Sequence, residues 1–176
     1  MTITSLVYPP RSIKPNLAKI IPSIVQPMIG EVCSQVSFSY GDELTLDFGE
    51  LTPYNHPRLA DLLKGSWQLT TRATPWSLKQ NENRLVTPSA LDTEKAITQA
   101  KNLVKQLENQ KLMDLTIEEE SICLSLTFDV GFQVTLEPDL SDNSGLAYWE
   151  LLMPTKQILT VGPGYFWSCK SINELS

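Results

Sequence analysis

The chain has 176 residues, 20 acidic and 14 basic, which gives a formal net charge of −6. This length fits one domain that can bury a core without disulfides or metals, and a hydrophobic fraction of 41% excludes a largely disordered chain. Residues 1–30 hold three cations and no acid, so the acidic charge is concentrated in the remainder. An acidic body repels phosphate backbones, and we therefore expect no nucleic-acid partner.

The cysteines do not follow a secreted pattern. Cys33, Cys123 and Cys169 are odd in number and widely spaced, whereas disulfide frameworks use dense, even sets of cysteines. The uncharged stretch 20–30 is about half a membrane span and is interrupted by two prolines. We expect reduced thiols, no signal peptide, no membrane segment and a cytoplasmic location.

Residues 1–30 contain five of the twelve prolines. Proline fixes φ and lacks an N–H, so this segment is predicted to be extended or polyproline-like with only short turns. It is too apolar for a disordered tail. The predicted organisation is a proline-rich arm, 1–30, that docks on the body or on a neighbouring subunit, followed by a single α+β domain, 31–176.

Apolar and polar residues alternate in 36–40 and again in 44–48, which is typical of half-buried strands. The even-numbered side chains must share a face, so the connecting loop needs an odd number of residues. Three loop residues would pair Tyr40 with Leu44, and five are the alternative. A two-residue Gly-Asp turn would divide the apolar set between both faces.

A second hairpin is predicted from 124–128 and 132–136, joined by a three-residue loop that ends at Gly131, where a left-handed residue is needed. Its pattern matches the first hairpin with almost no identity. Convergent patterning explains the match, and duplication is the alternative.

Between the hairpins, 65–73 reads as a strand that Pro75 ends or bends before a second strand begins at Trp76. A helix is predicted over about 90–110, with Asp92 as the preferred N-cap and Thr87-Pro88 as an earlier alternative start. Its single apolar stripe consists of Ala96, Ile97, Ala100, Leu103, Val104 and Leu107.

Later strands are predicted from Met113, Leu115 and Ile117, from 146–153 and from 157–161, followed by a break at 162–164. The predicted fold is α+β: a curved antiparallel sheet or open barrel of about eight strands, packed on one main amphipathic helix.

Motifs for reactive chemistry are missing from the sequence. Neither phosphate-binding glycine motif occurs, and three cysteines with one histidine do not form a zinc pattern. Asp139, Asp142 and Asn143 share a loop, but no calcium-loop glutamate follows. His56 lies in a predicted surface turn. We therefore expect no cofactor, no metal and no catalytic residues.

Two clusters are candidate ligand- or partner-binding sites. In the first, Arg72 leaves the strand on the side opposite Trp67, close to Trp76, and Glu150 is a candidate partner for the guanidinium. This arrangement describes either an arginine offered to a ligand carboxylate or a structural cross-strand ion pair.

The second cluster is the aromatic run Tyr165, Phe166 and Trp167. A strand would show these rings on both faces, so one face could cap the core while the other meets a partner.

The chain resembles small uncharacterised bacterial α+β proteins with a G-x-W-x-L strand, one helix and a closing hairpin. The resemblance covers roughly 32–153 and implies no assigned activity. Its motifs are Gly65-x-Trp67-x-Leu69 with Trp76, then Leu124-x-Leu126-x-Phe128-x-x-Gly131, then Trp149-Glu150-Leu151.

We expect a non-catalytic binding or interaction protein that is able to self-associate with a copy of itself or bind another protein. The alternative is a carrier of a small, unidentified ligand with a pocket near Arg72. A metal-independent enzyme that uses carboxylates is the third reading.

Overall fold

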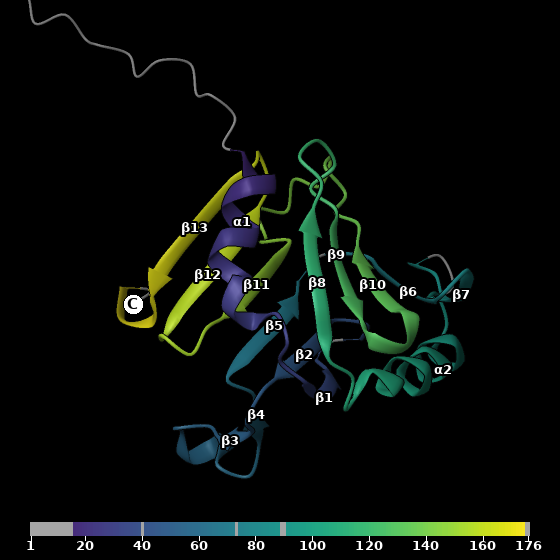
Figure 1. Cartoon of the computed structure of the whole chain (residues 1–176), viewed down its shortest axis with the longest axis horizontal. Helices are drawn as coiled ribbons and strands as arrows, with labels where there is room; N and C mark the ends of the chain where they lie inside the picture. Colours follow the sequence, from purple (N-terminus) through teal and green to yellow (C-terminus); the bar gives the residue numbers. More distant parts are fainter. Residues whose placement is uncertain (1–15, 40, 73, 89–90, 175–176) are drawn as a thin grey trace, which may run out of the picture.

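The computed structural model describes residues 16–39, 41–72, 74–88 and 91–174, and shows two α-helices and thirteen strands, all in antiparallel sheets. The first sheet has the order β1-β2-β5-β11-β12-β13 (Figure 1). Its strands are β1 (Cys33–Phe38), β2 (Leu44–Phe48), β5 (Trp67–Thr71), β11 (Trp149–Leu152), β12 (Gln157–Gly162) and β13 (Phe166–Ser171).

The second sheet has the order β7-β6-β10-β9-β8, and a separate small ribbon pairs β3 with β4. The strands of the second sheet are β6 (Trp76–Gln80), β7 (Asn83–Val86), β8 (Leu112–Ile117), β9 (Leu124–Phe128) and β10 (Phe132–Leu136). The small ribbon consists of β3 (Thr52–Pro53) and β4 (Leu63–Lys64).

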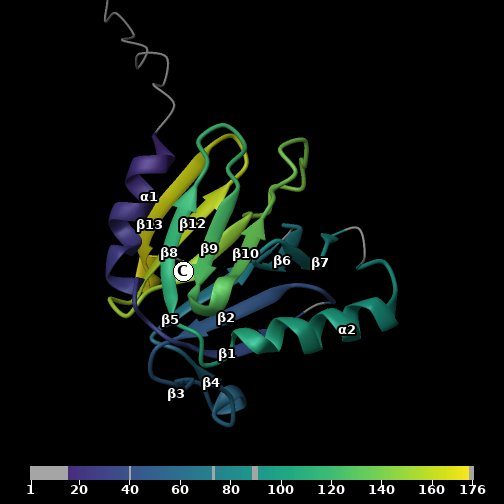
Figure 2. The ribbon, with the colours of Figure 1, turned by 45° about the vertical axis from the view of Figure 1, so that its right-hand side comes forward.

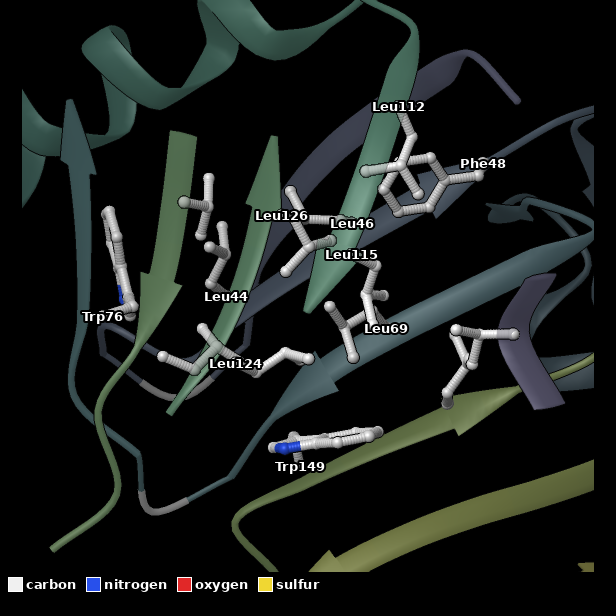
Figure 3. Packing of buried hydrophobic residues seen from close by; sticks show 14 of the residues in the cluster. Leu44, Leu46, Phe48, Leu69, Trp76, Leu112, Leu115, Leu124, Leu126 and Trp149 are labelled. Atoms are coloured by element: carbon white, nitrogen blue, oxygen red, sulfur yellow. The ribbon is translucent and has the colours of Figure 1, made fainter. Parts of the chain in front are cut away.

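The core lies between the two large sheets, which face each other (Figure 3). Buried and half-buried residues alternate along β5, β9, β10 and β11. The Phe48 and Phe128 rings from opposite sheets stack with their centres 6.1 Å apart. The predicted α+β class and antiparallel pairing are therefore confirmed. The prediction of one curved sheet or open barrel around a helix is wrong, because β6 to β10 form a second sheet before β11 to β13 rejoin the first.

The helix α1 (Leu17–Val25) corrects the prediction that the whole proline-rich arm is extended. Its buried side chains, Leu17, Ile21 and Val25, recur every four residues along one face. The Asn16 side chain accepts a hydrogen bond from the Lys19 N–H and begins the helix. Burial of this face outweighs the single intrahelical bond that the helix loses at its internal proline.

Figure 1 shows α1 beside β8 and in front of β12 and β13, so the helix extends the second layer beyond the edge of its sheet. Met28, in the 3-10 turn after α1, is also fully buried. The part of the predicted arm that covers 1–15 lies outside the described residues, and the division into an arm and a body stays a prediction.

The helix α2 (Glu94–Val104) follows the predicted apolar stripe, with Ala100 and Val104 buried. Its N-cap is Thr93, whose side chain accepts from the Ala96 N–H, so the predicted Asp92 cap is wrong by one residue. Figure 2 shows α2 at the lower right, below β2, at the periphery of the sheets. It therefore covers one end of the core and is not the element on which the strands pack.

The first hairpin confirms the odd-numbered loop. Phe38 pairs with Leu44 and Val36 with Leu46, which leaves the five residues 39–43 between the strands. The pairing of Tyr40 with Leu44 is therefore wrong, and the five-residue alternative is correct. In the second hairpin Leu126 pairs with Val134 across residues 129–131, and Gly131 has the expected positive φ of 82°.

The strand β8 departs from strict alternation at one residue. A bulge between Leu112 and Asp114 turns Met113 outward, where 53% of it is exposed. The strand predicted from Met113, Leu115 and Ile117 is therefore present, but Met113 does not share the inner face with the other two. Leu112 takes the inner position instead and is fully buried.

All three cysteines are free, and they differ in burial. Desolvation, reinforced by the nearby Glu108 and Asp47 carboxylates, raises the pKa of Cys33 from 9.0 to about 12. We expect native Cys33 to react with iodoacetamide at pH 8 about a thousandfold more slowly than an ordinary thiol, because the thiolate is the nucleophile. Cys123, which is only half-buried, is the internal comparison. Peptide mass mapping measures both rates, and equal labelling of Cys33 and Cys123 would contradict the prediction.

Candidate ligand groove on the outer face of the first sheet

The outer face of the first sheet is polar because its strands alternate. Ser37, Thr45 and Thr70 occupy one row across β1, β2 and β5, since each pairs with the next. Gln35, Asp47 and Gln68 form the adjacent row. An antiparallel sheet with one buried face normally turns such a row to water. In this chain part of that face is covered.

The cover is the segment 50–64, which contains β3, a 3-10 turn at Pro57–Leu59 and β4. It folds back on itself, with β3 paired to β4. The Tyr54 hydroxyl accepts a 2.8 Å hydrogen bond from the Gln68 amide of β5, which ties the segment to the sheet. All five residues of β2 are buried as a result, including those on its outer side.

A hollow of about 370 Å³ remains between this segment and the sheet, and we call it the Asp47 groove. Its lining combines polar side chains of the sheet with apolar side chains at the margin. The lining residues are Gln35, Ser37, Phe38, Ser39, Thr45, Asp47, Tyr54, Leu62, Leu63, Gln68, Thr70 and Arg72.

Asp47 lies at the floor of the groove and has no exposed surface. Its Oδ1 accepts two hydrogen bonds, from the Gly65 N–H at 2.8 Å and from Gln68 Nε2 at 2.9 Å. Its Oδ2 has no hydrogen-bond partner. Desolvation raises the pKa of this carboxyl above 3.8, although the two hydrogen bonds and Lys64 oppose the rise. A buried carboxylate oxygen without a partner is costly in a stable protein.

The bonds around Asp47 fix the orientation of its neighbours. The Gln68 amide nitrogen donates to both Asp47 Oδ1 and the Tyr54 hydroxyl oxygen. Because the Tyr54 oxygen already accepts from Gln68, its own proton is available to donate in another direction. Asp47, Gln68 and Tyr54 thus form a hydrogen-bonded chain that presents a tyrosine hydroxyl as a donor.

Arg72 stands at the other end of the groove. Its Nε and Nη2 donate to Glu150 Oε2 at 3.2 and 2.9 Å, on the side of the sheet opposite Trp67. A second hollow of about 260 Å³ lies next to Arg72, between Asp42, Thr74 and two prolines. The arginine therefore has the carboxylate partner that its position suggested, and it also borders two hollows.

The other predicted site residues lie elsewhere. Trp67 and Trp76 are buried in the core, and Trp76 Nε1 donates to the Asp42 carbonyl at 2.7 Å. Phe166 is 52% exposed on β13, whereas Trp167 is half-buried against the core. Tyr165 donates its hydroxyl proton to the Glu120 carbonyl at 3.1 Å. The two tryptophans of the first cluster are thus core residues, and neither lines the hollows beside Arg72.

The polar residues considered for catalysis or metal binding have local structural roles. His56 caps the turn at Pro57–Leu59, and its Nδ1 accepts from the Arg58 N–H. Asp139 and Asp142 accept hydrogen bonds from Ser141 and Ser144 within their own loop. No three His, Cys, Asp or Glu side chains in the described ranges gather closely enough to hold a metal ion.

Sequence reasoning missed Asp47, Tyr54 and Gln68. One signal was present: Asp47 is the single charged residue of β2 and stands between Leu46 and Phe48. Its significance depends on the covering segment 50–64, whose position the local pattern does not specify.

Comparisons of the chain with known protein families, with curated proteins and with solved structures find no match. The resemblance to small bacterial proteins therefore stays a prediction. Within the described residues, neither helix has the length and apolar character needed to cross a membrane.

The raised pKa of Asp47 gives a pH-dependent stability effect. Because the native state binds this proton more tightly than the unfolded state, ionisation of Asp47 destabilises the fold as pH rises from about 4 through the raised pKa. Below 3.8 the penalty is relieved. We expect the stability of Asp47→Asn relative to the natural chain to increase with pH across this window.

Urea unfolding of both proteins at several pH values measures this difference. Asp139→Asn is the control, because Asp139 is a fully exposed acid whose pKa is lowered by Ser141; its relative stability should change in the opposite direction. A pH-independent difference for Asp47→Asn would contradict the prediction.

Proposed function

We propose that the chain is a non-catalytic binding protein that holds a small polar ligand in the Asp47 groove. The observation that carries this proposal is the groove itself, about 370 Å³ in volume and within the size range of small-molecule sites. Its donors and acceptors come from three adjacent strands and one covering segment. Such an array is held rigidly before a ligand arrives.

The titratable groups around the groove support binding over catalysis. Asp47 is the single buried acidic or basic side chain among the described residues, and it already accepts two hydrogen bonds. Acid–base mechanisms that use carboxylates need a second group poised to exchange a proton. Arg72 and Glu150 neutralise one another at the rim.

The test is a titration of the ¹⁵N-labelled full chain with a library of small polar fragments, followed by amide chemical shifts. Binding in the groove should shift the amides of Thr45, Gln68 and Thr70 together. Fragments that shift only amides elsewhere, or none at all, would overturn the proposal. That result would favour a protein, and not a small molecule, as the binding partner.

A second candidate function, self-association, is favoured by the edge strand β13. The Tyr148 N–H bonds to Val161 O, so odd-numbered residues of β12 face β11 and even-numbered ones face β13. Even-numbered residues of β12 pair with even-numbered residues of β13, such as Thr160 with Ser168. The backbone N–H and C=O groups of the odd-numbered residues Trp167, Cys169 and Ser171 therefore point away from β12, toward the open edge of the sheet. An open edge with an exposed Phe166 beside it is suited to pairing with a second copy.

Light scattering of the full chain tests this candidate. We expect a dimer that Phe166→Lys converts to a monomer, whereas Leu146→Lys, at a similarly exposed leucine in a loop, leaves it intact. A natural chain that is monomeric at high concentration would refute the candidate. A cytoplasmic location and the lack of a nucleic-acid partner belong to the same set of proposals, supported by the free thiols and the acidic body.

A further inference from the structure

We infer that the ligand of the Asp47 groove is an uncharged polyhydroxylated molecule, a mono- or disaccharide. This inference rests on the proposed binding function and specifies the chemical class of the ligand. It follows from which groups line the groove, which charges there already have partners, and how large the hollow is.

Neutral hydrogen-bonding side chains dominate the lining. Hydroxyl and amide groups supply most of the polar surface: Gln35, Ser37, Ser39, Thr45, Tyr54, Gln68 and Thr70. A hydroxyl both donates and accepts, and so does the combination of amide nitrogen and oxygen. The sugar hydroxyl is the ligand group with the same dual character, so it can pair with these groups in either sense. A wholly apolar ligand would leave the buried ones unpaired, at a cost for each.

The charged groups do not favour an ionic ligand. The Arg72 guanidinium already binds Glu150 at 2.9 Å, so an anion would have to displace that carboxylate. An anion would also approach the Asp47 carboxyl at the floor. A cation would seek Asp47, but this residue has no exposed surface. Its Oδ1 already accepts two hydrogen bonds, and its Oδ2, which has no partner, is buried below the groove surface. Lys64, whose Nζ lies 5.4 Å from the centre of the Tyr54 ring, adds positive charge on the same side.

Asp47 acts on the ligand through its neighbours and is a positioning residue. It holds the Gln68 amide, and Gln68 in turn directs the Tyr54 hydroxyl proton away from itself. The groove therefore offers a fixed donor at Tyr54, which suits a hydroxyl or ring oxygen. Such preorganised donors improve affinity because fewer rotors must be ordered on binding.

The apolar residues at the margin suit the other surface of a sugar. Phe38, Leu62, Leu63 and the Tyr54 ring line the same hollow as the hydroxyl row. A pyranose ring carries hydroxyls around its edge and C–H groups on its faces, so it can meet both kinds of wall at once. The volume of about 370 Å³ is near the lower end for small-molecule sites and matches one or two rings.

The experiment titrates the ¹⁵N-labelled full chain with glucose, galactose, N-acetylglucosamine, maltose and cellobiose. Putrescine and citrate serve as charged probes of comparable size. We expect at least one sugar to shift the amides of Thr45, Gln68 and Thr70 in a saturable manner. Putrescine and citrate should leave these amides unchanged.

Two matched variants locate the effect. Thr70→Val removes one hydroxyl from the groove while keeping the side-chain shape, and should weaken sugar binding about fivefold. Thr160→Val is the control, because Thr160 lies in the same cross-strand row as Thr70, on the far side of Glu150. Both positions are half-buried on the outer face, so equal weakening by both would overturn the inference.

The outcomes separate the two levels of the proposal. If putrescine or citrate shifted the groove amides, the saccharide assignment would be overturned while the binding function would stand. The same conclusion would follow if polar fragments shifted these amides but none of the five sugars did. Shifts with none of the fragments, sugars or charged probes would overturn both. A sugar that binds and is weakened by Thr70→Val alone supports both.

Discussion

Replacement of Trp76 by alanine should lower the free energy of unfolding by about 3–5 kcal/mol, the range for removing a large aromatic side chain from a core. Trp76 is fully buried between the sheets at the start of β6, and its ring centre lies 6.1 Å from that of Phe38. Its Nε1 donates to the Asp42 carbonyl, which fixes the β1–β2 loop against the second sheet. The substitution therefore removes a contact between the two layers.

Urea denaturation followed by far-ultraviolet circular dichroism measures this loss. Trp76→Phe is the matched control, because it retains most of the buried volume and removes the indole N–H, and it should cost clearly less than Trp76→Ala. If the alanine variant lost less than about 1 kcal/mol, the tryptophan would have to be peripheral, contrary to its burial.

The second large effect is expected at Gly65, where the chain leaves β4 and enters β5. A Cβ atom added there would lie 2.6 Å from both the backbone N and the backbone O of Phe48. Backbone atoms of a paired strand cannot move aside cheaply. The Gly65 N–H also bonds to Asp47. We expect Gly65→Ala to cost about 3 kcal/mol, the upper end for overpacking, and to disturb the Asp47 groove.

Thermal and urea unfolding of Gly65→Ala test this expectation. Gly162→Ala is the control, since its added Cβ would meet the Ala147 Cα only at 3.6 Å, an ordinary contact. The control should change the stability by less than about 0.5 kcal/mol. Equal stability of the two variants would show that Phe48 and Gly65 are not as closely opposed as the structure has them.

The strand pairing of this fold is largely encoded locally. Even-numbered apolar residues in both halves of the 36–48 ribbon require an odd loop, and the structure has five residues there. Gly131 predicts the turn of the second hairpin, because the backbone there needs a positive φ. Such features depend on neighbours in sequence, so alternation and turn chemistry are enough to predict them.

Features that depend on distant packing were not predictable in the same way. Helix α1 contains a proline and has no acid in its first turn, and it forms because Leu17, Ile21 and Val25 find a buried position beside β8. The division into two sheets depends on where the chain goes after Pro75. The floor of the groove depends on segment 50–64 folding over Asp47, which no local pattern specifies.

The strand order of the first sheet bears on how the chain is made. β5 pairs on one side with β2, but its other neighbour is β11, which follows the whole second sheet in sequence. While a ribosome is still elongating the chain, the edge of β5 that pairs with β11 has no partner until residues 149–152 have emerged. The first sheet is therefore completed last. A nascent chain that stalls before that point exposes an unpaired strand edge to the nascent chains of neighbouring ribosomes on the same mRNA.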